Sequence, residues 1–219
     1  MKGIVLACPT LKREMLAAWQ KEDSSLPIYF LPARLHNDLQ EMHSYLQHTI
    51  DSLANVDRIY LCTTGCGGST VGIVANTAEI ILPRTRDCLD ILLSKEKLKK
   101  LERDIRGFYY TASWMDFCKN SSIDLEHLTH KMGRMEAEKY LRKLYAKCKD
   151  YYIIDTGCYD LAPVKAYVEP LVEIVQGNLH YVKGEYNILR KMAREEIDED
   201  FYRVPMGGKI PSGIFFPKL

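Results

Sequence analysis

Four cysteines of this chain stand shortly after apolar runs that predict β-strands. They are Cys8 after Gly3–Ala7, Cys66 after Arg58–Cys62, Cys88 after Glu79–Leu82 and Cys158 after Tyr151–Asp155. In an open α/β sheet the loops that leave the carboxyl ends of the strands gather along one edge, where ligands bind. We therefore expect thiols that are far apart in the sequence to meet at one site.

Such a set of thiols would suit a soft metal centre. We predict a zinc ion or an iron–sulfur cluster, because these groups take three thiolates and an imidazole or a fourth thiolate. The predicted ligands are Cys8, Cys66 and Cys88, with His36 or Cys158 as the fourth donor. The chain has no Cys-x-x-Cys pair, so this prediction depends on topology alone. The alternative is that the thiols are small buried hydrophobic residues, as we predict for Cys62, Cys118 and Cys148, which fall within a strand or helices.

A loop of small residues surrounds Cys66. Gly65, Gly67, Gly68 and Ser69 lie between a buried strand and a predicted helix, where glycines let backbone amides approach a cofactor or an anion. The spacing matches neither a Walker loop nor a dinucleotide fingerprint, and a tight turn without a ligand is the alternative. A thiol at a helix amino terminus has a lowered pKa, so Cys66 is the predicted catalytic residue.

Further residues of the predicted cofactor-binding edge follow other strands. Arg84 and Arg86 precede Cys88 and would pair with a carboxylate or phosphate. Trp114 would line the cleft with an aromatic face, and Asp155 would supply a carboxylate. The alternatives are a core position for Trp114 and a turn for Asp155, while Asp87 is a predicted helix N-cap.

The composition restricts the classes of partner. Lysine and arginine number 30 against 29 aspartate and glutamate, for a net charge of +1. This balance supplies no basic field for nucleic acid and no single-sign surface for a membrane. No apolar stretch approaches the ~18 residues that span a bilayer. Seven cysteines without a secretory signal predict reduced thiols and a cytoplasmic location.

Strands and helices alternate along the chain, which predicts an α/β fold with a mainly parallel sheet and helices on both faces, three-layered and Rossmann-like. We predict one domain over 1–204, with two lobes of about 1–106 and 107–204 as the alternative, and an irregular tail over 205–219. Predicted helices include 36–53, 125–148, 160–175 and 185–196.

Five segments together carry a resemblance to a known family. They are Leu-Pro-Ala-Arg-Leu-His-Asn, Gly-Cys-Gly-Gly-Ser-Thr-Val-Gly, Pro-Arg-Thr-Arg-Asp-Cys-Leu-Asp-Ile-Leu-Leu, Thr-Ala-Ser-Trp and Ile-Asp-Thr-Gly. In this order they resemble domain of unknown function 1638, a family of anaerobic bacteria and methanogenic archaea. The resemblance implies motif cysteines at Cys8, Cys66 and Cys88, and a setting beside corrinoid-dependent methyl transfer. The chain departs from the family at Ser113, where glycine is expected, and at Thr85, where histidine or an acid is expected.

Three functions are consistent with these observations. The first is a metal- or cluster-binding protein in corrinoid-linked methyl transfer or cofactor handling, with a corrinoid supplied by a partner. The second is a metal-free enzyme that uses Cys66 and another thiol as an acid and base pair on a small anionic substrate, as cofactor-independent racemases do. The third is a non-catalytic subunit of a methyl-transfer complex.

Overall fold

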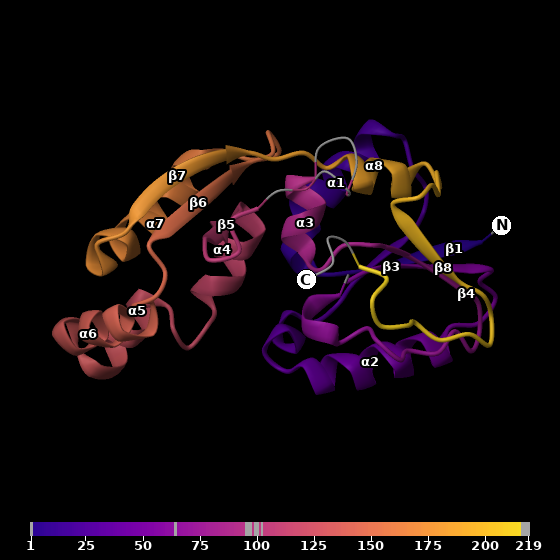
Figure 1. Ribbon diagram of the computed structural model, residues 1–219, viewed down its shortest axis with the longest axis horizontal. Helices are drawn as coiled ribbons and strands as arrows, with labels where there is room; N and C mark the ends of the chain where they lie inside the picture. The colour runs from indigo at the N-terminus through magenta and orange to yellow at the C-terminus, as the bar shows by residue number, and fades with distance from the viewer. Residues whose placement is uncertain (1, 64, 95–97, 99–100, 102, 216–219) are drawn as a thin grey trace. The chain divides into compact units, whose positions relative to one another are not determined.

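The chain folds into two compact units. The computed structural model describes residues 2–63, 65–94, 98, 101 and 103–215. Unit 1 comprises Met1–Glu102 and Glu185–Leu219, and unit 2 comprises Arg103–Gly184. The chain therefore leaves unit 1, builds unit 2 and returns (Figure 1). The two units are described separately below.

Unit 1 is built on a mainly parallel sheet. In the described residues the sheet has five strands, in the order β2-β1-β3-β4-β8. The strands are β1 (Gly3–Ala7), β2 (Ile28–Phe30), β3 (Arg58–Cys62), β4 (Glu79–Pro83) and β8 (Phe201–Val204). The helices are α1 (Lys12–Lys21), α2 (Leu39–Ser52), α3 (Cys88–Leu93) and α8 (Asn187–Ala193). Figure 1 shows α1, α3 and α8 on one face of the sheet and α2 on the other, which confirms the predicted α/β class.

The sequence of α2 explains both its position and its start. Met42, Leu46 and Ile50 repeat at helical spacing and pack into the core that covers one face of the sheet. Asp38 caps the helix, because its side chain accepts hydrogen bonds from the amides of residues 40 and 41, both at 2.9 Å. The helix therefore begins at Leu39, and the predicted start at His36 lies in a 3-10 turn, η2 (Ala33–Asn37).

The sequence did not predict strand β8, which returns to unit 1 and pairs antiparallel with β4. Arg203 on β8 donates to both carboxylate oxygens of Glu79, at 2.8 and 3.0 Å. From Pro205 to residue 215 the described chain forms no helix or strand, and its Ile210 and Ile214 are buried in the core. Residues 216–219 of the predicted tail lie outside the described residues.

Unit 2 has a smaller sheet. The strands β5 (Phe108–Tyr110), β6 (Asp150–Asp155) and β7 (Asn178–Lys183) pair in parallel in the order β5-β6-β7. The helices are α4 (Ala112–Lys119), α5 (Leu125–Met132), α6 (Arg134–Leu144) and α7 (Leu161–Val175). Helices and strands share one apolar core. Within the described residues, no helix of either unit is long and apolar enough to cross a membrane.

The predicted helix over 125–148 is broken at Gly133. This residue has φ 82° and ψ 156°, a conformation that only glycine adopts readily. Its position between α5 and α6 ends the first helix and starts the second. The charge spacing along 125–148 is helical on both sides of the break, so the periodicity alone could not reveal it.

Helix α8 is attached to α1 by an ion-pair cluster. Glu22, directly after α1, accepts a hydrogen bond from Nε of Arg190 and pairs with Arg194 at 3.2 Å. The hydrogen bond from Arg190 lowers the pKa of Glu22 below its usual value of 4.5. The cluster holds the returning segment of the chain against the first helix of unit 1.

We predict that Glu22→Gln lowers the melting temperature more at pH 7 than at pH 3. Because the folded-state pKa is lowered, the ion pair stabilises the fold above the unfolded pKa and is lost as the pH falls through the folded pKa. Thermal unfolding across this range measures the difference. Glu136→Gln, which removes an exposed ion pair with Lys139, is the control. An equal loss at both pH values would contradict the assignment.

Candidate functional site

The structure brings three of the predicted thiols together at the carboxyl edge of the sheet of unit 1. Cys8 follows β1, Cys66 begins the 3-10 turn η3 (Cys66–Gly68) after β3, and Cys88 begins α3 after β4. Burial raises the pKa of Cys88, and the neighbouring thiols of Cys8 and Cys66 raise it further. The three sulfur atoms are therefore electrostatic neighbours.

Cys8 has a hydroxyl and an imidazole beside it. Its Sγ lies 3.0 Å from Oγ1 of Thr10 and 3.6 Å from Nδ1 of His36. Burial raises the pKa of Cys8 and lowers the pKa of His36. Both shifts favour the uncharged form, so Cys8 is a neutral thiol and His36 a neutral imidazole at neutral pH.

Two residues of this cluster were missed in the sequence. Thr10 follows Cys8 by two positions, and its hydroxyl also lowers the pKa of the Cys88 thiol, against the larger effect of burial. Cys62, predicted as a packing residue, is fully buried at the end of β3, where burial and the thiols of Cys8 and Cys66 raise its pKa. The position of Thr10 in the Cys8 turn was a usable signal. Nothing in the strand pattern separated Cys62 from an ordinary core residue.

Cys66 occupies an unusual backbone conformation. Its φ is 30°, which is rare for a residue with a side chain. The residue is partly exposed, and its thiol donates a hydrogen bond to the carbonyl oxygen of Thr63 at 2.6 Å. Such strain persists only where the surrounding structure imposes it, and it occurs often at functional sites.

The glycine loop uses several of its amides internally. Gly65 donates to the carbonyl of Thr85 at 3.1 Å, Gly68 to that of Gly65 at 2.6 Å, and Ser69 to that of Cys66 at 3.3 Å. Thr64 lies outside the described residues. The role of Gly65, Gly67, Gly68 and Ser69 in binding an anion stays a prediction, since these bonds also fit a tight turn.

Gly65 is required by a close approach of two loops. A Cβ at this position would lie 2.7 Å from the carbonyl oxygen of Arg86. The loop after β3 therefore packs backbone to backbone against the loop after β4. This contact fixes Cys66 relative to Cys88.

The two arginines predicted to bind an anion hold this edge together. Arg86 donates from its amide, Nε and Nη2 to the carboxylate of Asp90, at 3.0, 2.8 and 3.0 Å, and Asp90 is fully buried. Nε of Arg84 donates to the carbonyl of Ile214 at 2.9 Å. These contacts indicate a structural role, and anion binding by Arg84 and Arg86 stays a prediction. Asp87 caps α3 as predicted.

The chemistry of the donors and their arrangement point in different directions. Three thiols and an imidazole are a donor set typical of zinc. Among the residues that the structure describes, however, no group of three or more histidine, cysteine or acidic side chains is arranged to hold a metal ion.

The hydroxyl of Thr85, fully buried, has no hydrogen-bond partner within the described chain. A buried orphan hydroxyl of this kind is one that a bound ligand would satisfy.

The remaining predicted residues belong to unit 2. Trp114 lies on α4, stacks on Phe117 with ring centroids 4.9 Å apart, and packs against the core. Asp155 accepts hydrogen bonds from the amide of Gly157 at 3.0 Å and from Lys183 at 3.2 Å, as expected of a turn residue. Cys158 donates to the carbonyl of Thr156 at 3.8 Å. Roles for Trp114, Asp155 and Cys158 at the thiol cluster stay predictions.

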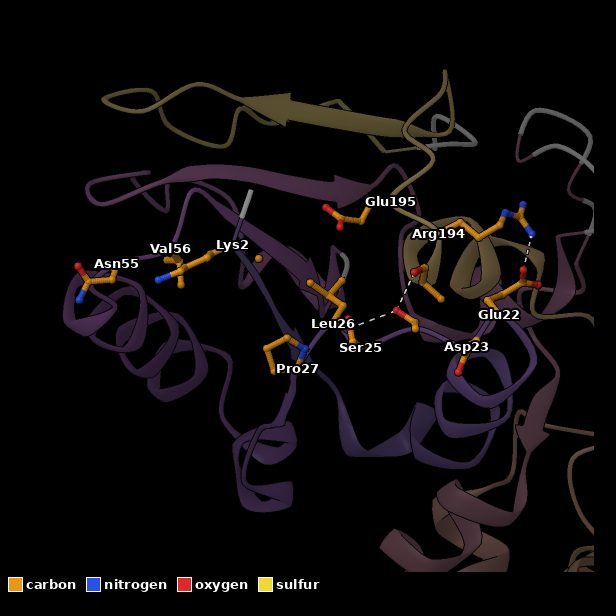
Figure 2. A pocket seen from close by; sticks show the side chains of 13 residues that line it. Lys2, Glu22, Asp23, Ser25, Leu26, Pro27, Asn55, Val56, Arg194 and Glu195 are labelled. Carbon is orange, nitrogen blue, oxygen red and sulfur yellow. Dashed lines mark hydrogen bonds and ion pairs between the residues drawn. The ribbon is translucent and has the colours of Figure 1, made fainter.

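A separate cavity of about 580 Å³ lies at the opposite edge of the unit 1 sheet (Figure 2). Residues that precede β1, β2 and β3 line it, so it is at the amino ends of the strands. Figure 2 shows Glu22 and Arg194 paired at its rim, and Glu195 accepts a hydrogen bond from Tyr60 at 2.7 Å. The described lining contains no cysteine or histidine. The thiol cluster is therefore the better candidate for chemistry.

Comparison with known proteins identifies a family without an assigned activity. Residues 30–193 match a family model described as "Protein of unknown function (DUF1638)". No curated protein and no solved structure matches the chain.

We predict that Asp90→Ala lowers the free energy of unfolding by about 3 kcal/mol, because it leaves a largely buried arginine without its carboxylate. The matched control is Glu138→Ala on α6, which breaks pairs with Arg134 and Arg142 at exposed positions and should cost under about 1 kcal/mol. Urea unfolding measures both. Similar losses in the two variants would contradict a structural role for the Arg86–Asp90 pair.

Proposed function

We propose that this chain, which belongs to the DUF1638 family, is a metal-independent thiol enzyme. The description of the family names no activity. The site of the proposed enzyme is the cluster at the carboxyl edge of unit 1, and its substrate class is a small anionic molecule. Cys66 is the reacting group, as a base or nucleophile, and a neighbouring buried thiol is the acid. The observation that carries this proposal is the difference in exposure between Cys66, which is partly exposed, and Cys8 and Cys62, which are buried.

The argument begins with ionisation. Burial raises the pKa of Cys8, Cys62 and Cys88, so each keeps its proton at neutral pH. A negative charge on any one of the clustered thiols opposes ionisation of the next. The cluster therefore favours a single thiolate with protonated neighbours.

Cys66 is the member best placed to be that thiolate. It is partly exposed, so its charge loses less hydration than a charge on the fully enclosed Cys8 or Cys62. In this structure the Cys66 thiol is protonated and donates a hydrogen bond to the carbonyl oxygen of Thr63. Cys66 must therefore be deprotonated before it can act as the base or nucleophile. In many active sites, the acid and the base are two titratable groups whose environments give them different pKa values.

A proton-transfer reaction at carbon needs no other reacting group, provided that proton exchange with water returns Cys66 to the thiolate and its neighbour to the thiol after each turnover. The Cys66 thiolate takes a proton from a C–H bond next to the carboxylate of the substrate, and the electron pair stays on the substrate. A protonated neighbour, Cys8 or Cys88, then gives its proton to that carbon. Oγ1 of Thr10 lies 3.0 Å from the Sγ of Cys8 and lowers the pKa of Cys88, which supports Thr10 as a residue that positions the acid.

Metal binding is the second candidate, and one observation favours it. Nδ1 of His36 lies 3.6 Å from the Sγ of Cys8, with Cys66 and Cys88 as electrostatic neighbours. A soft cation would displace the thiol protons. The side chains would have to rearrange first, because the described residues form no group ready to hold a metal.

A corrinoid or methyltransferase partner, and a non-catalytic role in such a complex, stay predictions that rest on the family resemblance. A cytoplasmic location stays a prediction that rests on the expected reduced thiols.

Thiol labelling tests the leading proposal. We predict that, with iodoacetamide near pH 7, Cys66 is alkylated at least about tenfold faster than Cys8 or Cys62, because those two thiols are buried and protonated while Cys66 is partly exposed. Peptide mapping by mass spectrometry gives the rate at each cysteine. Cys66→Ser should remove this fast phase, and Cys118→Ser in unit 2 should leave it unchanged. Equal, slow labelling of all four cysteines of the cluster would defeat the proposal.

Elemental analysis separates the two candidates. Protein purified without oxygen should contain far less than one zinc or iron per chain if the site acts without metal. A near-stoichiometric metal content that falls in Cys66→Ala but stays in Cys118→Ala would replace the leading proposal by the metal centre.

A further inference from the structure

Unit 2 contains a cavity of about 850 Å³ that plays no part in the thiol cluster of unit 1. This volume lies within the range of about 300–1,000 Å³ that is typical of small-molecule sites. The cavity is formed where the start of β5, the segment before α5 and the end of α6 meet. Its lining separates into an apolar wall, two cations and one thiol.

The apolar wall has one part packed against the core and one part that is uncovered. Phe108 and Tyr145 meet edge to face, with ring centroids 5.5 Å apart, and both pack against the core of unit 2. Ile123 and Leu144 complete the wall and are 38% and 48% exposed. An apolar ligand would remove this surface from water and rest on a preformed aromatic base.

The charges on the lining all have one sign. Arg106 and Lys147 are exposed at the cavity, and neither forms an ion pair with any residue in the described part of the chain. No acidic residue is among the described lining. Two cations with no ion-pair partner in the described part of the chain, placed beside an apolar wall, favour a ligand with an anionic head, and the guanidinium of Arg106 suits a carboxylate.

The thiol of Cys148 lies between this cavity and the core. Its Sγ lies 3.5 Å from the carbonyl oxygen of Arg106 and 3.7 Å from that of Asp150. On the core side, Cys148 is close enough to Tyr151 to help burial raise the pKa of that tyrosine. Cys148 is partly exposed, so a ligand in the cavity would shield it.

We propose that this cavity binds an aliphatic monocarboxylate of medium chain length. The alkyl chain lies against Phe108, Ile123, Leu144 and Tyr145, and the carboxylate pairs with Arg106 and Lys147. The site is independent of the thiol chemistry proposed for unit 1, and either assignment stands if the other fails.

Octanoate is the probe, with octanol and octylamine as analogues of equal chain length. We expect octanoate to bind in calorimetry and to slow alkylation of Cys148 by at least about fivefold, while octylamine binds at least about tenfold more weakly because its charge is repelled. Arg106→Ala and Lys147→Ala should each weaken octanoate binding by about tenfold and leave octanol binding unchanged.

Two variants of α6 provide a matched pair. Leu144→Asp places a carboxylate in the cavity and should abolish octanoate binding, whereas Met135→Asp, at a position that is 84% exposed and outside the lining, should not change it. Circular dichroism shows that both variants are folded, and the two alanine variants test the site if Leu144→Asp is not. Absence of octanoate binding, equal protection of Cys148 by all three compounds, or octanoate binding that survives both alanine substitutions would overturn the proposal.

Discussion

The enclosure of thiols at the carboxyl edge of a parallel sheet is the constraint on which the chemistry of unit 1 depends. Strands β1, β3 and β4 run in the same direction, so the turns that follow them deliver Cys8, Cys66 and Cys88 to one edge. Enclosure there removes water from the sulfur atoms and holds most of them protonated. The buried thiols of the cluster are thus uncharged, and the partly exposed Cys66 is the member proposed to carry a charge.

The strands and the class of fold follow from local pattern, because apolar runs of strand length alternate with amphipathic segments and few architectures accept that order. The departures have local causes. Asp38 caps α2, so this helix begins at Leu39 and not at His36 as predicted. Gly133 divides one predicted helix into two. Strand β8 pairs with β4 only after the chain has returned from unit 2. A four-residue strand whose partner is more than a hundred positions away leaves almost no signal in the sequence around it.

The candidate site was predictable to the extent that topology alone determines it. The order of the strands was enough to group the loops of Cys8, Cys66 and Cys88, but not to assign their neighbours. Arg86 illustrates the difference: its type and position suggested an anion site, yet its partner is Asp90, one helical turn away. A sequence shows which side chains share an edge, while pairing within that edge depends on side-chain rotamers and burial, which appear only in three dimensions.

Thr10 and Gly65 show how the cluster is held without a metal or a disulfide. The hydroxyl of Thr10 lies 3.0 Å from the Sγ of Cys8 and also lowers the pKa of Cys88, and the missing side chain of Gly65 lets the loops after β3 and β4 touch. One polar contact and one backbone contact thus constrain the loops that carry the thiols. The strained backbone of Cys66 lies inside this frame. A strained conformation of this kind persists in a folded protein where the surrounding structure imposes it.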